Sequence, residues 1–355
     1  MKPRIAMVGV GGIGGTIAAN LLRAGHDVTM IDQWAANVEA IRAQGLTLSD
    51  IDETFTVEGP ALHISDVSNI SAPFDLVFLS VKGYDTVWSA HLIAPHLKPG
   101  GCMLAAMNAL PDEAVAGVVG WTRTVGCVAT ISAGMYRPGH AVRTDIKGHA
   151  FTVGELHGLS TPRAELAAEL LSAVGPSDVT GNIWGVRWAK MVWNCMTNAL
   201  AGLLGDATLD ADQQRLRDRV EAALGYEAAA VATGLGVALE AVLGMAPERF
   251  VAAGTRAGLA ALSELVGAIH AQRGLTPEQA ARLPAPGRPS LLQDVLKGRR
   301  TEVQQLNGHV VAEGQHIGVP TPINAAVVEL MDALATRQTE PGIGCLEHLG
   351  ALLAG

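Results

Sequence analysis

The sequence predicts an α/β protein, with an N-terminal doubly wound parallel sheet over residues 1–180 and an all-helical region over residues 181–355. In the first half, short apolar runs alternate with helix-like segments, which is typical of a parallel sheet covered by helices. From about Gly181 the strand-like runs disappear and segments rich in helix-forming residues take their place. A length of 355 residues also favours about two domains.

Composition excludes several functional classes. Apolar residues make up 49% of the chain and charged residues 17%, which is a composition of folded rather than disordered proteins. The net charge is −9 and no basic block is present, so nucleic acid is not expected as a partner. The most apolar later stretch, residues 228–239, is shorter than the roughly 20 residues that span a bilayer. We therefore expect a cytoplasmic protein that does not enter the membrane.

The cysteines and histidines indicate no metal site. Four cysteines lie far apart without a CxxC pair, which argues against a disulfide framework or a zinc site and suits a reducing compartment. The eleven histidines show neither HxxxH nor HExxH spacing. We expect no bound metal.

The first apolar run, Arg4–Val8, leads into a glycine-rich turn, and a helix-like segment and a second apolar run follow. Gly9, Gly11 and Gly14 fit the pattern G-x-G-x-x-G in the strand–turn–helix context that dinucleotide binding requires. The glycines allow a tight turn, a close approach of the backbone to a pyrophosphate and close helix–strand packing. The alternative is a glycine-rich turn without a ligand. The predicted cofactor-binding turn comprises Gly9, Val10, Gly11, Gly12, Ile13 and Gly14.

Asp32 ends the second apolar run, where the ribose of the adenosine half would lie. A carboxylate there accepts a hydrogen bond from the ribose 2′-hydroxyl and repels a 2′-phosphate. Gln33 and Trp34 follow, and neither is a cation. Asp32 therefore favours NAD(H), while NADP(H) remains possible; the alternative for Asp32 is an ordinary residue at a strand end.

Four further strand-like runs lie at residues 75–82, 102–108, 124–132 and 150–155. In doubly wound sheets ligands bind beyond the carboxyl ends of the strands. Lys82 and Asn108 end two of these runs, so both are predicted to face the cofactor. Each could instead be a solvated loop residue.

The helical half contains a polar stripe on an apolar helix. Within residues 187–200, Lys190, Asn194 and Asn198 are spaced i, i+4 and i+8, which places them on one face, one turn apart. The other faces are apolar, so the stripe needs hydrogen-bond partners, water or a ligand. A structural hydrogen-bond ladder or an ordinary solvated face is the alternative to a binding site.

Five motifs in this order resemble the ketopantoate reductase family. They are GVGGIG at the start, SVK at 80–82, MNA at 107–109, RWAKMVWNCMTNAL at 187–200 and SLLQDVLKGRRTEVQQLNG at 290–308. The resemblance covers most of the chain. It implies a Rossmann domain followed by a helical domain like that of 6-phosphogluconate dehydrogenase. It also implies that this helical domain binds substrate and that the protein forms a homodimer.

The resemblance also implies roles for single residues. Lys190 matches the family's general acid, which protonates the carbonyl oxygen of a 2-oxo acid as it is reduced to a 2-hydroxy acid. The other matches are Asn194 and Asn198 (substrate hydrogen bonds), Ser290 (substrate carboxylate), Glu302 (orientation of the lysine or of a substrate hydroxyl), Asn108 (beside the nicotinamide and the lysine) and Lys82 (near the cofactor).

Two of these residues also have simple structural explanations. Ser290 follows a Pro/Gly-rich loop at the start of a short helix, where serine is a common N-cap. Thr301 and Gln304 form a capping-box pattern that would place Glu302 in the first turn of the next helix, where the helix dipole stabilises a carboxylate.

The chain departs from the family pattern at several points. Met107-Asn108-Ala109 stands where Gln-Asn-Gly is common, and Asp32-Gln33 where an arginine often binds a 2′-phosphate. Residues 246–265 and 336–355 are additional length. These departures leave the reduction chemistry in place but do not identify the 2-oxo acid. A 3-hydroxyacid-type dehydrogenase and a non-catalytic dinucleotide-binding sensor remain as alternatives.

Overall fold

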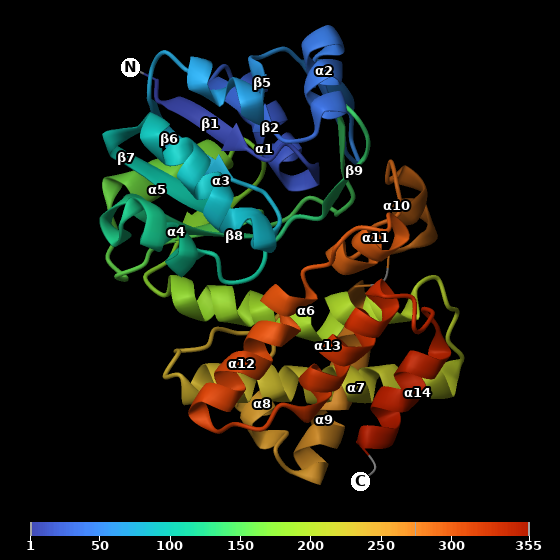
Figure 1. Ribbon diagram of the computed structural model, residues 1–355. Helices are drawn as coiled ribbons and strands as arrows, with labels where there is room; N and C mark the ends of the chain where they lie inside the picture. Colours follow the sequence, from blue (N-terminus) through green and yellow to red (C-terminus); the bar gives the residue numbers. More distant parts are fainter. Residues whose placement is uncertain (1, 274, 354–355) are drawn as a thin grey trace. The chain divides into compact units, whose positions relative to one another are not determined.

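The computed structural model describes residues 2–273 and 275–353 (Figure 1). The chain forms two compact units, Met1–Ile183 with Leu275–Gly287, and Trp184–Gly274 with Arg288–Gly355. The predicted fold class, a doubly wound sheet followed by a helical region, is confirmed.

The first unit is built on an eight-stranded sheet with the order β12-β11-β8-β7-β6-β1-β2-β5. The six neighbouring strands β8, β7, β6, β1, β2 and β5 pair in parallel. Strand β11 is antiparallel to β8 and parallel to β12. The bounds are β1 Arg4–Val8, β2 Asp27–Asp32, β5 Ala61–His63, β6 Phe74–Leu79, β7 Leu97–Ala106, β8 Thr124–Ala129, β11 Phe151–Glu155 and β12 Ser177–Val179.

Both faces of this sheet are buried, as expected of parallel strands. Alternate residues of β1 enter two separate apolar clusters, Ile5 and Met7 on one face, Ala6 and Val8 on the other. Helices α1 and α5 cover the first face, and α3 and α4 cover the second. The bounds are α1 Gly12–Arg23, α2 Ala35–Gln44, α3 Thr86–Ile93, α4 Asp112–Val119 and α5 Pro162–Leu171.

A second, four-stranded sheet with the order β4-β3-β10-β9 was not predicted from the sequence. It packs on α1, where a Cβ added at Gly15 would lie 3.0 Å from the Cβ of Ala141. Its strands β3 and β10 pair in parallel although they lie far apart in the chain. The bounds are β3 Leu46–Ser49, β4 Thr54–Val57, β9 Ala133–Arg137 and β10 His140–Arg143.

The second unit is helical, and α7 packs against α8, α9, α12, α13 and α14 (Figure 1). Glu227 of α7 is buried, and its carboxylate accepts hydrogen bonds from the backbone N–H groups of Ile323 and Asn324 at 2.9 and 2.8 Å. These two hydrogen bonds give partners to N–H groups in the first turn of α13, which have no partner within the helix. The bounds are α6 Ile183–Leu204, α7 Ala211–Gly234, α8 Pro247–Ala252, α9 Arg256–Arg273, α11 Ser290–Leu296, α12 Asn307–Ile317, α13 Pro322–Ala335 and α14 Ile343–Leu352.

One short segment belongs with the first unit, although the sequence predicted it to be part of the helical domain over residues 181–355. Residues 275–287, which include α10 (Pro277–Arg282), group with the sheet. The Arg282 guanidinium lies 3.2 Å from the Asp52 carboxylate, and a Cβ at Gly287 would lie 3.3 Å from the Thr144 carbonyl oxygen. These contacts explain the assignment.

The additional length forms regular structure. Residues 246–265 supply α8 and the start of α9, and α14 lies within residues 336–353. Ala354 and Gly355, at the end of that extension, lie outside the described residues. Among the described helices, none combines the length and the apolar character needed to cross a bilayer.

Candidate functional site

The glycine-rich turn between β1 and α1 combines a positive φ with close backbone approaches, which its glycines permit. Gly9 has φ +88°, and its N–H donates to the Ile31 carbonyl at 2.8 Å. A Cβ at Gly9 would lie 2.6 Å from the Ser80 carbonyl oxygen, and one at Gly14 would collide with the Gly9 carbonyl oxygen. Only glycine fits at either position without a backbone shift.

The turn is open on one side, at Gly11. A Cβ added there would meet no atom within 4 Å, and Gly11 precedes α1 without a side-chain cap. The open space and the uncapped helix start fit a dinucleotide pyrophosphate, which accepts hydrogen bonds from such N–H groups. Gly12 differs, because a Cβ there would lie 2.6 Å from the Gly134 backbone nitrogen of β9. Its predicted contact with the cofactor stays a prediction, and its packing against β9 is a reason for glycine in itself.

Asp32 links the end of β2 to the glycine-rich turn. One carboxylate oxygen accepts from the Val10 N–H at 2.7 Å and from the Asn37 amide at 3.3 Å, and the other accepts from the Trp34 N–H at 2.8 Å. A carboxylate offers about four acceptor sites, so one remains, on the oxygen that faces Trp34. Asp32 therefore stabilises the turn and can still accept one further donor.

Lys82 and Asn108 lie at one edge of the sheet. Lys82 follows β6 and precedes the short 3₁₀ turn Gly83–Asp85, and Asn108 follows β7, the strand that pairs with β6. Both residues are half-buried. The next residue, Ala109, has φ +67°, in the left-handed region that favours glycine. Since β6 also pairs with β1, the two side chains belong to the same edge as Gly9.

The polar stripe lies on α6 of the second unit. Asn194 and Asn198 are buried, with 2% and 8% of their surface exposed, and Lys190 is half-buried. Burial of the amine, together with the positive charge of Arg273 on α9, lowers the pKa of Lys190 to about 8. A lysine with this pKa is partly neutral near pH 8, which suits it to give and take a proton.

Ser290 is joined to this stripe. The Asn198 amide donates to the Ser290 hydroxyl at 3.4 Å. The N-cap explanation for Ser290 is wrong, because Pro289 occupies the N-cap position of α11. Pro289 has φ −55°, and its fixed ring leads Ser290 directly into the first turn.

Glu302 is buried, with 3% of its surface exposed, and precedes the 3₁₀ turn Val303–Gln305. The predicted capping box of Thr301 and Gln304 is wrong, because α12 begins only at Asn307. The Gln304 amide donates instead to the Asp332 carboxylate at 3.0 Å. Glu302 therefore does not lie in the first turn of an α-helix, and the helix-dipole explanation for its carboxylate fails.

The segment that follows Glu302 is fixed to α6. The Asn307 amide donates to the Cys195 carbonyl oxygen at 3.1 Å and to the Asn324 side-chain oxygen at 2.9 Å. The rings of Trp188 and His309 also lie 5.9 Å apart. Within the second unit, the structure thus brings Asn198 and Ser290 together and holds the Glu302 segment against the helix that carries Lys190 and Asn194.

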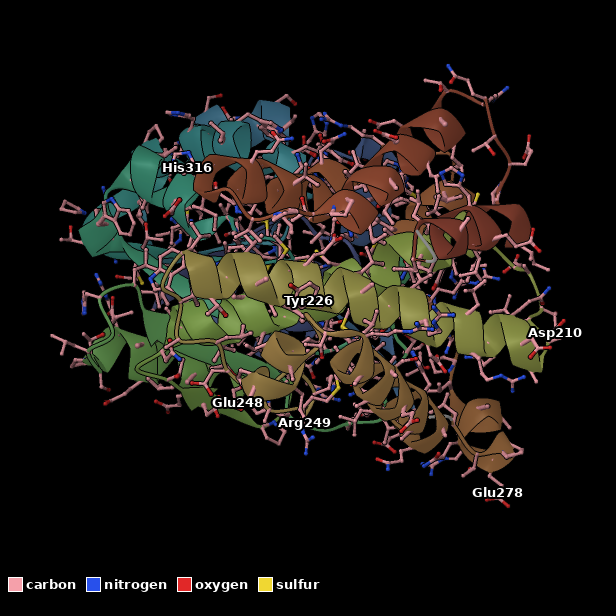
Figure 2. All side chains as sticks on the ribbon, turned by 90° about the horizontal axis from the view of Figure 1, so that it is seen from below. Asp210, Tyr226, Glu248, Arg249, Glu278 and His316 are labelled. Carbon is pink, nitrogen blue, oxygen red and sulfur yellow. The ribbon has the colours of Figure 1, made fainter. Side chains whose placement is uncertain are left out.

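Sequence reasoning missed a cavity of about 340 Å³ in the second unit. Polar residues from α7 and α9 form part of its wall, and Figure 2 shows α7 lengthwise, from Asp210 at its start past Tyr226. No local spacing could have revealed this wall, since its members come from separate helices. The residues that line the cavity are Thr197, Leu200, Ala201, Leu204, Gly205, Ala207, Leu209, Gln214, Arg217, Glu221, His270 and Pro289.

Comparisons with known proteins match both halves of the chain to one family. Residues 5–158 match the family described as Ketopantoate reductase PanE/ApbA, and residues 182–335 match its C-terminal part. A 2-dehydropantoate 2-reductase from Archaeoglobus fulgidus is 25% identical over 92% of this chain and 96% of its own.

Solved structures show the same fold. The crystal structure of a PanE/ApbA family ketopantoate reductase from Ralstonia eutropha JMP134 is 25% identical, covers 95% of this chain and 100% of its own, and has a TM-score of 0.74. A D-mandelate dehydrogenase with NADH and anilino(oxo)acetate is 21% identical, covers 94% and 99%, and also has a TM-score of 0.74.

Proposed function

The chain belongs to the ketopantoate reductase family, and from this premise we propose that it reduces a 2-oxo acid to a 2-hydroxy acid with a nicotinamide dinucleotide. It is an oxidoreductase of the class that acts on CH–OH groups. The observation that carries the proposal is the partly buried Lys190, whose pKa is lowered to about 8, in line with two buried asparagines.

A reduced nicotinamide, when bound, supplies the hydride. The Lys190 ammonium donates its proton to the carbonyl oxygen and stabilises the negative charge that develops there. Asn194 donates a hydrogen bond to the substrate, and Asn198 and Ser290 hold it through its carboxylate. Glu302 orients the Lys190 amine or a substrate hydroxyl. All of these groups belong to the second unit.

The first unit holds the cofactor in this proposal. The glycine-rich turn receives the pyrophosphate, and Lys82 and Asn108 lie near the nicotinamide half. The remaining acceptor site of Asp32 receives a ribose hydroxyl, which favours NAD(H) over NADP(H). The D-mandelate dehydrogenase of the same fold was solved with NADH, which is consistent with this preference.

A screen of 2-oxo acids with NADH and NADPH, and of 2-hydroxy and 3-hydroxy acids with the oxidised cofactors, tests the proposal. We expect cofactor oxidation with at least one 2-oxo acid, and loss of that activity in Lys190→Ala while circular dichroism shows a folded protein. Turnover of 3-hydroxy acids alone would instead indicate the 3-hydroxyacid-type dehydrogenase. Tight NADH binding without turnover of any acid would indicate a sensor. The predicted homodimer and cytoplasmic location stay predictions.

A further inference from the structure

We infer that Asp85 is a second determinant of cofactor choice, and that its carboxylate excludes the 2′-phosphate of NADP(H) from the adenosine end of the cofactor site. This inference rests on the proposed function, because it concerns the cofactor site proposed for the first unit. It is carried by the place of Asp85 beside Gln33, by the contacts that fix its carboxylate and by the charges of the neighbouring side chains.

Asp85 and Gln33 meet across the end of the central strand. Asp85 ends the 3₁₀ turn that follows β6, and Gln33 follows β2. Strand β1 lies between these two strands, and all three run in parallel, so their carboxyl ends lie at one edge of the sheet. The Gln33 amide donates to one Asp85 carboxylate oxygen at 3.3 Å. This contact therefore lies at the edge where doubly wound folds bind a dinucleotide.

The backbone around Gln33 is fixed beside the proposed ribose-binding residue. The Gln33 carbonyl oxygen lies 3.1 Å from Nε2 of His63, the last residue of β5, which pairs with β2. On the other side, the Trp34 N–H donates to the Asp32 carboxylate at 2.8 Å. In dinucleotide-binding folds the group that accommodates a 2′-phosphate lies near the acidic residue that binds the ribose. A 2′-phosphate on a ribose held by Asp32 would thus enter the region of Gln33 and approach Asp85.

The Asp85 side chain is held in place. Trp88 Nε1, on α3, donates to its second carboxylate oxygen at 2.7 Å, and the Asp85 N–H donates to the Lys82 carbonyl oxygen at 2.8 Å. The Thr86 hydroxyl orders the same turn by donating to the Gly83 carbonyl oxygen at 2.8 Å. Asp85 is half-buried. A carboxylate fixed in this way cannot rotate away from an incoming anion as a free surface side chain can.

A cation close to this region is already paired with carboxylates. Arg42, on α2, lies 2.9 Å from the Glu39 carboxylate and 2.8 Å from the Asp66 carboxylate. Asp66 also accepts from the N–H of His63, the residue that contacts Gln33. A phosphate monoester carries a charge of about −1.5 to −2 at pH 7 and would have to compete with both carboxylates for Arg42. The ribose 2′-hydroxyl of NAD(H) is neutral and meets no such repulsion.

The test measures the dissociation constants of NADH and NADPH by fluorescence titration on the full chain, with circular dichroism to show that each variant is folded. We expect the native protein to bind NADH at least tenfold more tightly, and Asp85→Asn to tighten NADPH binding at least about fivefold with little change for NADH. Asp85→Glu keeps the charge and should keep the preference. Asp27→Asn, an exposed change at the amino end of β2, is the matched control and should leave the preference unchanged.

Two further measurements separate charge from shape. Raising the salt concentration from about 0.01 to 1 M shortens the Debye length from about 30 to 3 Å, so the native preference for NADH should shrink, and it should shrink less in Asp85→Asn. In Gln33→Arg the new arginine can pair with Asp85, whereas in Gln33→Arg/Asp85→Asn it is available to the phosphate. The double variant should therefore bind NADPH at least about threefold more tightly than Gln33→Arg.

An unchanged preference in Asp85→Asn, or an equal change in Asp27→Asn, overturns the role of Asp85 while the reductase proposal stands. Loss of the preference in Asp85→Glu to the same extent as in Asp85→Asn overturns it as well, because the charge is then not the cause. Tighter binding of NADPH by the native protein overturns the roles of both Asp85 and Asp32. A protein that binds neither cofactor overturns the proposed function itself, and the role of Asp85 with it.

Discussion

The Asn198 amide donates to the Ser290 hydroxyl at 3.4 Å and thereby joins α6 to the start of α11. The two residues are 92 positions apart in the chain, so this contact depends on the tertiary structure. Pro289, and not Ser290, occupies the N-cap position of α11. The proposed function assigns this pair to the substrate carboxylate.

Ser290→Ala should raise KM for the 2-oxo acid about tenfold, since one hydrogen bond to a charged group contributes about 1.5 kcal/mol. The effect on kcat should be smaller, because the carboxylate does not change charge in the reaction. Steady-state kinetics with Asn198→Ala and the double variant completes a mutant cycle, in which the two losses should not add. Ser263→Ala on α9 is the control. Additive losses would show that the two residues act separately.

The pH dependence of the reduction should report the lowered pKa of Lys190. The protonated amine is the acid, so kcat/KM should be constant at neutral pH and fall as the pH rises through about 8. Lys190→Ala should lower kcat by about 10² to 10⁴-fold and remove this descending limb. A descending limb that persists in Lys190→Ala would assign the titration to another group.

Arg273 provides a second test of the same pKa. Its positive charge disfavours the Lys190 ammonium, so Arg273→Gln should raise the pKa and move the descending limb to higher pH. The shift should be a fraction of a pH unit, because Arg273 is exposed and salt screens its charge. Arg256→Gln, at the other end of α9, should leave the limb in place. A shift to lower pH would contradict the electrostatic cause.

Local patterns made much of this protein predictable. The alternation of apolar runs and helices predicted the large sheet, and the strand–turn–helix context of Gly9, Gly11 and Gly14 predicted the turn that the structure shows open at Gly11. The spacing of Lys190, Asn194 and Asn198 placed them on one helix face, and α6 does run unbroken through all three. Each of these patterns is contained within a short stretch of chain.

The features that were missed depend on contacts between distant segments. Strands β3 and β10 pair through Thr47 and His140, and neither segment has an apolar run long enough to stand out. The Glu221–His270 contact joins two helices whose residues show no metal or catalytic spacing. Ser290 and Thr301 each fit a capping pattern in sequence, yet Pro289 and the 3₁₀ turn after Glu302 decide the local structure.

Cofactor choice should depend on the residue after Asp32. Gln33 is exposed and follows Asp32, the residue proposed to bind the ribose. Gln33→Arg therefore supplies the cation that a 2′-phosphate requires without replacing Asp32. We expect the native protein to bind NADH more tightly than NADPH, and Gln33→Arg to improve NADPH binding about tenfold while Gln33→Ala does not. Fluorescence titration with both cofactors measures this. Tighter binding of NADPH by the native protein would contradict the role given to Asp32.

The folded protein should be less stable with alanine at position 109 than with glycine there. Its φ of +67° costs an alanine about 1–2 kcal/mol relative to glycine, while glycine makes the unfolded chain more flexible at a cost of about 0.4–1 kcal/mol. The first effect is the larger, so Ala109→Gly should raise the free energy of unfolding by about 0.5–1 kcal/mol in urea denaturation. Ala261→Gly, in the exposed interior of α9, should lower the free energy of unfolding by about 1 kcal/mol. Equal destabilisation by both changes would show that Ala109 is not strained, and the backbone that presents Asn108 would then be relaxed.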